Sequence, residues 1–367
     1  MNYFDNENNI EFDKKIKVLG LALYGERAAS ARVRLSQYIE PLLEKNIEME
    51  VNHLLIDDYV KFLSTRRNFP FYKILCSFFR RLKLLFQIKN YDLVILHCEL
   101  LPFVPAWIER LLLRKTKYIY DLDDAFYLKY QSGKYGYLKW FLGKKFDHTI
   151  KKAAFVNAGN QNILDYVTKF NSNAQILPSV VDTDIYKAHD ESIMIKDELV
   201  IGWIGSPSTS DYLNNLIDEF EELGKSINIK LKIIGAKFPS LNNVKVECFE
   251  WNIDKEINDL NSFDIGIMPL TDDPWSRGKC GYKLIQYMSC KIPVIASNVG
   301  VNSTIVDKEC GILAVENSDW SKAIKFLFNE PETRIMMGQA ARKKIIESYS
   351  LKANIPKLCD SIIRILK

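Results

Sequence analysis

A short lysine-containing stretch, GKCGYKLIQYMSC (278–290), holds side chains well suited to binding a phosphate group. Its apolar pattern predicts a helix, on which Lys279, Lys283 and Gln286 would share one narrow stripe, because successive residues turn by about 100°. Two ammonium groups and an amide in one row can neutralise and hydrogen-bond a diphosphate. The simpler alternative is the solvated face of an amphipathic helix, so the neighbouring loops must decide.

A second stretch, IGWIGSPSTSDYL (201–213), is typical of a strand, a tight turn and a helix start. Unpaired backbone amides at a helix N-terminus bind anions, and Ser206, Ser208 and Thr209 would add hydroxyl donors. The alternative is that one of these residues only caps the helix. Both stretches follow a predicted strand in the same half of the chain. Together they predict a pyrophosphate site made of cations and N–H donors.

Three carboxylates end a predicted strand in the other half, at Asp121, Asp123 and Asp124 of YDLDDAFY (120–127). Carboxylates so close together are costly unless they bind a cation, accept substrate hydroxyls or act as a base. Asp121 and Asp123 have the DxD spacing of some metal sites, but this spacing is frequent by chance. Asp123 and Asp124 could also cap the following helix. We expect a role toward substrate and no metal site.

Three further candidates lie beside predicted strands of the same half. Arg32 and Arg34 come just after the first strand, and His97 ends the strand DLVILH (92–97). A single histidine is more often a hydrogen-bonded core residue than a catalyst. None of the four histidines has HExxH or another metal-ligand spacing.

Strands and helices must position these residues. The apolar pattern predicts two groups of alternating strands and helices, one in each half of the chain. Continuous apolar runs separated by helical patterns indicate parallel sheets covered on both faces. The predicted strands are 16–23, 48–55, 92–97, 117–123 and 153–159, then 198–205, 231–235, 263–268, 292–297 and 311–315. We therefore predict an α/β protein of two Rossmann-like, doubly wound domains that face each other across a cleft. Ligands bind outside the carboxyl ends of such strands.

Length and composition favour the same organisation. A chain of 367 residues exceeds the size at which one core keeps growing. We divide it into a loosely held N-terminus (1–14), an N-terminal domain (15–180), a C-terminal domain (181–348) and a last helix (349–367). The seven cysteines form no CxxC pair, which favours reduced thiols and a cytoplasmic location. We find no signal peptide pattern and no run of 18 apolar residues.

One segment, residues 59–91, mixes basic and aromatic side chains and contains no acidic residue. This composition suits the surface of an anionic membrane, at the inner face if the protein is cytoplasmic. The alternative is a solvated face above core aromatics. Nucleic acid would attract the same charges, but no nucleic-acid-binding module accompanies them, so we do not expect it as a partner.

The sequence resembles the GT-B glycosyltransferases, in particular the retaining family-4 (group 1) enzymes, over about residues 15–367. The block FDIGIMPLTDDPWSRGKCGYKLIQYMSCKIPVIASNVGVN (263–302) is similar to the donor site of this family, and CGILAVENSDWSKAI (310–324) to the segment after it. LPSVVDTDIY (177–186) resembles the interdomain segment, and SYSLKANIPKLCDSIIRIL (348–366) resembles a last helix that crosses back to the first domain.

The resemblance has three departures. The family commonly carries Glu-x7-Glu where this chain has Gly278 and Gln286, so neither glutamate remains. A basic residue after the first strand of the second domain is replaced by the turn that contains Ser206 and Ser208. Asp123 stands where many members have a histidine. These changes are similar to those of enzymes of bacterial surface-polysaccharide assembly, and leave an altered or lost activity open.

The resemblance implies transfer of a sugar from a nucleotide-diphosphate sugar, UDP-sugar as the first choice, to a saccharide or lipid-linked acceptor. Retention and metal independence come with it, and no cofactor is implied. Lys283 would stabilise the diphosphate and Asp123 would orient the acceptor hydroxyl. Arg32, Arg34, His97 and Asp124 would lie on the acceptor side. The donor side would comprise Ser206, Ser208, Thr209, Trp251, Lys279, Cys280, Gly281, Tyr282, Lys283 and Gln286.

Two other functions remain open at this point. A sugar-nucleotide epimerase can share this fold, and it would turn over the donor without an acceptor. A non-catalytic scaffold that binds other transferases would explain the missing glutamates. Trp251, in the loop FEWNID (249–254), is a candidate neighbour for the nucleotide base, and its alternative is a plug of the core.

Overall fold

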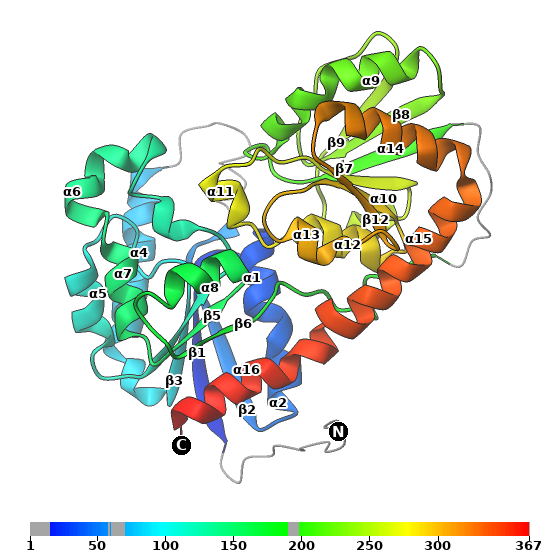
Figure 1. Cartoon of the computed structure of the whole chain (residues 1–367). Helices are drawn as coiled ribbons and strands as arrows, with labels where there is room; N and C mark the ends of the chain where they lie inside the picture. The colour runs from blue at the N-terminus through cyan, green and yellow to red at the C-terminus, as the bar shows by residue number, and fades with distance from the viewer. Residues whose placement is uncertain (1–14, 58, 60–69, 190–197, 367) are drawn as a thin grey trace.

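The computed structural model describes residues 15–57, 59, 70–189 and 198–366. The predicted N-terminus (1–14), residues 190–197 and residues 60–69 of the basic aromatic segment lie outside the described residues. The described strands form two six-stranded sheets, each with helices packed against it (Figure 1). The predicted α/β class with two Rossmann-like domains is therefore confirmed.

The first sheet has the order β2-β1-β3-β4-β5-β6, and every pair in it is parallel. The five predicted strands of this half are all present, with bounds within about two residues of those expected. The side chains of β1, β3, β4 and β5 are almost completely buried on both faces, which accounts for their continuous apolar runs. The strands are β1 (Ile16–Tyr24), β2 (Ile47–Leu55), β3 (Leu93–His97), β4 (Tyr118–Leu122), β5 (Phe155–Ala158) and β6 (Ala174–Ile176).

The second sheet has the order β12-β11-β10-β7-β8-β9 and is also parallel throughout. Its strands are β7 (Leu199–Ile204), β8 (Ile229–Ile234), β9 (Lys245–Phe249), β10 (Ile265–Met268), β11 (Val294–Ser297) and β12 (Gly311–Ala314). The sequence pattern misses β6 and β9. Both are edge strands whose side chains are half-buried or exposed, so neither has an apolar run to reveal it.

The strand order reverses direction between β1 and β3 in the first sheet and between β7 and β10 in the second. At such a point the loops on the two sides diverge and leave room for a ligand. The segment that follows β1 carries Arg32, and the segment that follows β3 begins directly after His97. The segments that follow β7 and β10 carry Thr209 and Lys279, respectively. The topology thus brings both groups of predicted site residues to the expected edges.

The helices cover both faces of the sheets, and their bounds follow in chain order. They are α1 (Ala29–Arg34), α2 (Ile39–Leu43), α4 (Phe71–Phe86), α5 (Ala106–Leu113), α6 (Lys139–Leu142), α7 (Lys145–Lys152), α8 (Gln161–Val167), α9 (Ile217–Gly224), α10 (Glu256–Leu260), α11 (Pro274–Arg277), α12 (Tyr282–Ser289), α13 (Asn302–Ile305), α14 (Asn317–Asn329), α15 (Pro331–Lys344) and α16 (Leu351–Leu366). None of the helices in the described part of the chain has the length and apolar character needed to cross a bilayer.

The helix predicted to begin at Gly278 begins instead at Tyr282, and this corrects the expected stripe. Asp273 caps the preceding helix α11, which ends at Arg277, and residues 278–281 form a loop. Gly281 has a φ of 66°, a left-handed value that favours glycine, and breaks the helical path. Lys279 is therefore in the loop, and only Lys283 and Gln286 belong to α12.

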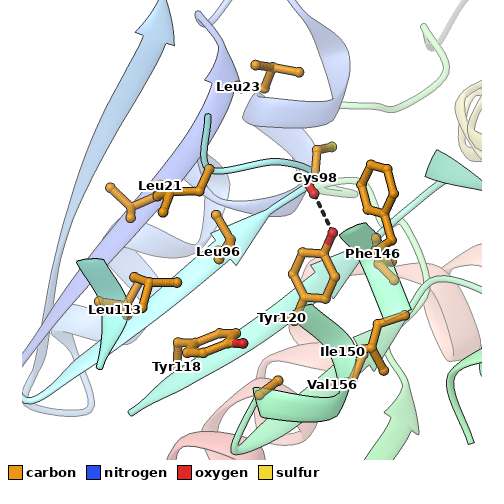
Figure 2. Packing of buried hydrophobic residues seen from close by; sticks show 14 of the residues in the cluster. Leu21, Leu23, Leu96, Cys98, Leu113, Tyr118, Tyr120, Phe146, Ile150 and Val156 are labelled. Atoms are coloured by element: carbon orange, nitrogen blue, oxygen red, sulfur yellow. Dashed lines mark hydrogen bonds between the residues drawn. The ribbon is translucent and has the colours of Figure 1, made fainter. Parts of the chain in front are cut away.

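Aromatic and aliphatic side chains fill the core between the first sheet and helices such as α5 and α7. Figure 2 shows Tyr120 standing among Leu96, Phe146 and Ile150 in this core. The Tyr120 hydroxyl donates a hydrogen bond of 2.5 Å to the carbonyl oxygen of Cys98 (Figure 2). A buried hydroxyl is costly without a partner, so this bond fixes the backbone just beyond β3.

The last helix, α16, lies against the first domain (Figure 1). Leu358, Ile362 and Ile365 pack into the same core as Val18 and Leu42, although they come more than 300 residues later in the chain. Val181 and Ser350 also form an isolated parallel bridge beside the connection between the domains. The end of the chain therefore stabilises the domain in which the chain begins.

Replacing Ile362 by alanine should lower the free energy of unfolding by about 2 to 5 kcal/mol, because it leaves a cavity between α16 and the first sheet. The Ile362 side chain is fully buried. Urea unfolding monitored by circular dichroism measures the change. The control is Asp360→Ala on the exposed side of the same helix, which should stay within about 0.5 kcal/mol of the parent. Equal stability of the two variants would show that α16 is not part of the core.

Candidate functional site

The loops at the carboxyl ends of the two sheets touch one another. The Asn160 side chain, at the start of α8, donates hydrogen bonds to the carbonyl oxygens of Gly278 (2.9 Å) and Lys279 (2.8 Å). A Cβ atom at Gly278 would lie 2.4 Å from the Cβ of Ala125 in the first domain. The family glutamate that the resemblance places at position 278 would not fit here. Its absence is thus linked to a close approach of the two domains.

Lys283 lies in the first turn of α12 and points between the domains. Its ammonium nitrogen is 3.4 Å from the hydroxyl oxygen of Thr209 and 5.2 Å from the centre of the Trp203 ring. Its side chain passes close to Gly205, where a Cβ would lie 2.6 Å from the lysine Cε. Among the described residues, no carboxylate lies within 4.0 Å of this ammonium group. Lys283 therefore carries a charge without a counterion.

The pKa of Lys283 is lowered to about 7. Burial is the main cause, the ammonium group of Lys279 adds to it, and Asp124 opposes it. A lysine in this state gains much from an anion, since the anion restores the charged form. Asp124 of the first domain interacts electrostatically with both Lys279 and Lys283, as a position of the two lysines at the interdomain face predicts.

Asp121 has a structural role and not a metal-binding one. The Arg34 guanidinium donates two hydrogen bonds to it, of 2.6 and 2.9 Å, and all three of Arg34, Asp121 and His97 are buried. Burial alone would raise the pKa of Asp121, but Arg34 and His97 lower it to about 2. Since both oxygens already have partners, Asp121 and Asp123 do not form a DxD metal site.

The other two carboxylates remain half-buried at the interdomain face. The pKa of Asp124 is raised to about 7, mainly by burial; Lys279 opposes this shift and the neighbouring Asp123 adds to it. A carboxyl group with a pKa near neutrality can both accept and release a proton at physiological pH. His97 lies behind them, with its Nε2 atom 3.7 Å from Asp123 Oδ1.

A buried cluster that the sequence pattern does not reveal surrounds Glu256 at the start of α10. Glu256 accepts hydrogen bonds from Gln286 Nε2 (2.9 Å), from the Trp251 indole N–H and from the Tyr186 hydroxyl. Arg32 of the first domain reaches this carboxylate at 3.8 Å and lies over the Trp251 ring at 5.2 Å. No spacing in the sequence marks Glu256, because its partners come from four different elements.

Two residues predicted on the donor side, Gln286 and Trp251, belong to this cluster around Glu256. Gln286 is buried, and its amide is already committed to Glu256. Trp251 is half-buried against the core of the second domain, as the alternative expected, and it also contacts Arg32 and Glu256. Arg32, which we placed on the acceptor side, thus contacts the donor domain directly.

The serine-rich turn after β7 is open to solvent. Ser206 and Ser208 are exposed, and their hydroxyl oxygens are 2.8 Å apart, while the Thr209 hydroxyl donates to the Ser206 carbonyl. No side chain caps the short 3₁₀ helix that follows, so the alternative of a helix cap is wrong for this turn. Thr209 contacts Lys283, which joins this turn to the lysine pair.

The remaining predicted residues surround the start of α12. The Cys280 thiol is buried against Gly159 of the first domain, where a Cβ would lie 2.2 Å from its sulfur. Gly281 precedes α12 and no side chain caps that helix, while the Tyr282 hydroxyl is 3.4 Å from that of Tyr186. The amides of the first turn of α12 are thus placed beside Lys283.

Comparison with known proteins identifies the second domain. Residues 198–330 match the family model described as "Glycosyl transferases group 1". No curated protein matches the chain in sequence.

Solved structures resemble the chain over almost its whole length. HepE of Anabaena in complex with UDP-glucose has 14% identity and a TM-score of 0.71, covering 95% of this chain and 99% of that one. A glycosyltransferase of Rickettsia africae has 17% identity and a TM-score of 0.70, covering 97% and 100%. Sucrose-phosphate synthase of Thermosynechococcus elongatus has 12% identity and a TM-score of 0.69, covering 95% and 99%. Residues 198–330 therefore form a group 1 glycosyl transferase domain, and the chain as a whole has the two-domain GT-B fold of solved glycosyltransferases.

Proposed function

We propose that the protein transfers a sugar from a nucleotide-diphosphate sugar, with a UDP-sugar as the first choice, to a saccharide or lipid-linked acceptor. One observation carries the proposal. Lys283 holds a half-buried ammonium group without a counterion at the start of α12, beside Lys279 and facing the carboxylates of the other domain. The group 1 domain and the UDP-glucose complex of a similar structure support the nucleotide-sugar part.

The lysine pair suits the departure of a diphosphate. When the bond between the sugar C1 and the diphosphate oxygen breaks, its electron pair stays on the oxygen, and negative charge grows there. Lys279, Lys283 and the first amides of α12 would stabilise this charge electrostatically. Stabilisation of the diphosphate by these groups requires no divalent ion. Retention requires the acceptor to attack from the side that the diphosphate leaves, which brings it next to the same cations.

The first domain would position the acceptor. Asp123 and Asp124 lie opposite the lysines, and either carboxylate can accept a hydrogen bond from an attacking hydroxyl. Arg34 and His97 would act indirectly, since both hydrogen-bond to Asp121 and hold the end of β4 in place. Gln286 would act through Glu256 and not by contact with the ribose, because its side chain is buried and donates to Glu256.

We also propose that the first domain docks on an anionic membrane surface, where a lipid-linked acceptor would be found. Helix α4 carries apolar side chains on both faces, and on its inner face Phe78, Leu82 and Leu85 pack against the core of the first domain. Its inner face buries Arg81, which donates to the carbonyl oxygens of Ala22 and Asn52, while its outer face exposes aromatic rings. The exposed apolar residues of α4 are Phe71, Tyr72, Leu75, Phe79 and Phe86, which we call the α4 outer face.

Neighbouring elements extend this apolar surface. Trp107 and Leu111 of α5 are exposed, and α5 packs beside α4 (Figure 1). Trp140 of α6 is 86% exposed. Arg80 and Lys83 lie on the solvent side of α4 among the rings. Four of the five aromatic side chains of α4 are exposed, which favours the membrane surface over the alternative of a solvated face above core aromatics.

Lys283→Ala should lower kcat by about 10² to 10³-fold, because the leaving diphosphate loses its main cation. The donor is first found by thermal shift with several nucleotide diphosphates, since a ligand at 100 times its Kd stabilises the fold by about 2.7 kcal/mol. Turnover of that donor is then measured with and without acceptor. Lys308→Ala, at an exposed site of the same domain, should match the parent.

The same assays separate the alternatives. More than a third of the parent turnover in Lys283→Ala would contradict the role given to this lysine. Turnover of the donor without acceptor, with an isomeric sugar nucleotide as product, would identify an epimerase. No heat of binding with any nucleotide diphosphate in calorimetry would favour a non-catalytic scaffold.

Nucleotide diphosphate affinity should fall as the pH rises from 7 to 9. The lowered pKa of Lys283, about 7, means that its charge is present below this pH and is lost above it. The phosphate itself changes little in this range, because its last pKa is about 6. Calorimetric Kd values for UDP at several pH values measure the slope. Lys283→Arg should flatten it, because guanidinium stays charged, and equal slopes for the two proteins would refute the assignment.

Binding to anionic vesicles should weaken with salt and with loss of the α4 outer face. The double variant Phe79→Ser/Phe86→Ser should reduce partitioning at least tenfold, because each ring contributes about 1.5 to 3 kcal/mol when buried. Lys83→Glu should reduce it on anionic vesicles only. Phe326→Ser, an exposed ring of the second domain, is the matched control. Equal partitioning of the parent to neutral and anionic vesicles would contradict the electrostatic contribution.

A further inference from the structure

We propose that His97, Cys98 and Asp123 form a binding site for one transition-metal ion, Zn²⁺ by the type of its ligands. The imidazole nitrogen, the thiol sulfur and a carboxylate oxygen of these residues lie within 4.8 Å of one another. This differs from the absence of metal expected from the sequence, and it concerns another place than the diphosphate. All three ligands belong to the first domain, whereas the lysines belong to the second.

His97 is oriented as metal-binding histidines are. Its Nδ1 lies 3.0 Å from Asp121 Oδ2, and Asp121 is held in turn by the two hydrogen bonds from Arg34. A carboxylate at Nδ1 places the proton on that nitrogen and leaves the lone pair of neutral imidazole on Nε2. That lone pair faces Cys98 Sγ at 3.0 Å and Asp123 Oδ1 at 3.7 Å.

The arrangement follows from the register of the sheet. His97 and Asp121 are direct partners at the carboxyl ends of β3 and β4, so their side chains emerge next to each other. Cys98 and Asp123 come one and two residues later, where the strands have ended. No spacing in the sequence indicates the site, because its ligands come from two strands that are separated along the chain.

Cys98 is held in an unfavourable backbone conformation that points its sulfur at His97. Its φ is 62°, a left-handed value that costs a non-glycine residue about 1 to 3 kcal/mol. Two hydrogen bonds maintain it: the Cys98 amide donates to the Asp121 carbonyl (3.2 Å) and the Tyr120 hydroxyl donates to the Cys98 carbonyl (Figure 2). Strain that the surroundings maintain in this way is common at ligand sites.

Asp123 is the third proposed ligand and the most exposed of the three residues. Its Oδ1 is 3.7 Å from Cys98 Sγ, and its side chain is 12% exposed, whereas those of His97 and Cys98 are closed off from solvent. Three protein ligands can bind a zinc ion whose fourth position is taken by water.

The ligand types select the metal. A thiolate, an imidazole and one carboxylate suit Zn²⁺, whereas Mg²⁺ and Ca²⁺ require oxygen ligands. Bond lengths of about 2.0 Å to nitrogen and 2.3 Å to sulfur give a separation of about 3.5 Å between the two atoms in a tetrahedral site. The present 3.0 Å would have to widen by about half an ångström when the ion binds.

The test uses Co²⁺ as a spectroscopic substitute for Zn²⁺ and requires no activity. The full chain is stripped with a chelator and titrated with Co²⁺. We expect a thiolate-to-cobalt charge-transfer band and tetrahedral d–d bands that saturate at one equivalent and disappear on addition of Zn²⁺. Cys98→Ser should lose the charge-transfer band, and Asp121→Asn should weaken binding about 10- to 100-fold by releasing His97. Cys290→Ala, a buried thiol of the second domain, should behave as the parent.

X-ray absorption of the zinc-loaded parent provides a measurement that needs no variant. One sulfur and two or three nitrogen or oxygen neighbours are expected around the ion. A shell of nitrogen and oxygen alone, no charge-transfer band in the parent, or a band that survives in folded Cys98→Ser would each overturn the proposal. Binding of nucleotide diphosphate is measured separately, so its failure would leave this result unchanged.

Discussion

The contact between Asn160 and the loop 278–281 is the constraint on which the rest of the site depends. One amide group holds two consecutive carbonyl oxygens of the second domain at the carboxyl end of β5. The loop can approach this closely only because position 278 has no side chain. Its position in turn sets where α12 begins, and therefore where Lys283 points. A glycine that looks like a lost functional residue in the sequence is, in the structure, a requirement of domain contact.

The charges around this contact fall into two kinds. Arg34 and Asp121 are fully buried and fully paired, and their role is to hold the strand ends and His97 in place. Lys283 and Asp124 are half-buried and incompletely paired, and the pKa values of both are shifted toward 7. Unpaired charge in a low-dielectric place is costly to the fold, so it is expected where a ligand provides the missing partner.

Arg32 and the Glu256 cluster form a second link between the domains. A charged side chain of the first domain stacks on Trp251 and approaches a buried carboxylate of the second, close to the predicted donor residues. Glu256 also accepts a hydrogen bond from the side-chain amide of Gln286. With the two family glutamates absent, this cluster places a different glutamate beside α12. The contact between the domains thus shares side chains with the predicted donor residues.

The sequence by itself determined the elements of the fold. Continuous apolar runs such as those of β1 and β7 mark buried parallel strands, and the alternation with helices leaves little choice of architecture. It also indicated Lys283, Asp123 and Asp124, because charged groups at the carboxyl ends of such strands lie where ligands bind. The edge strands β6 and β9 were not predicted, because half-exposed strands have no continuous apolar run.

Only the tertiary structure decided which of these groups are free and which are paired. Asp121 and Asp123 are equivalent in the sequence, yet one is neutralised by Arg34 from an earlier helix and the other is not. The start of α12 depended on a left-handed glycine, and the role of Gln286 on a glutamate 30 residues away. Pairing depends on side chains brought together from distant segments, and a local pattern contains no information on that distance.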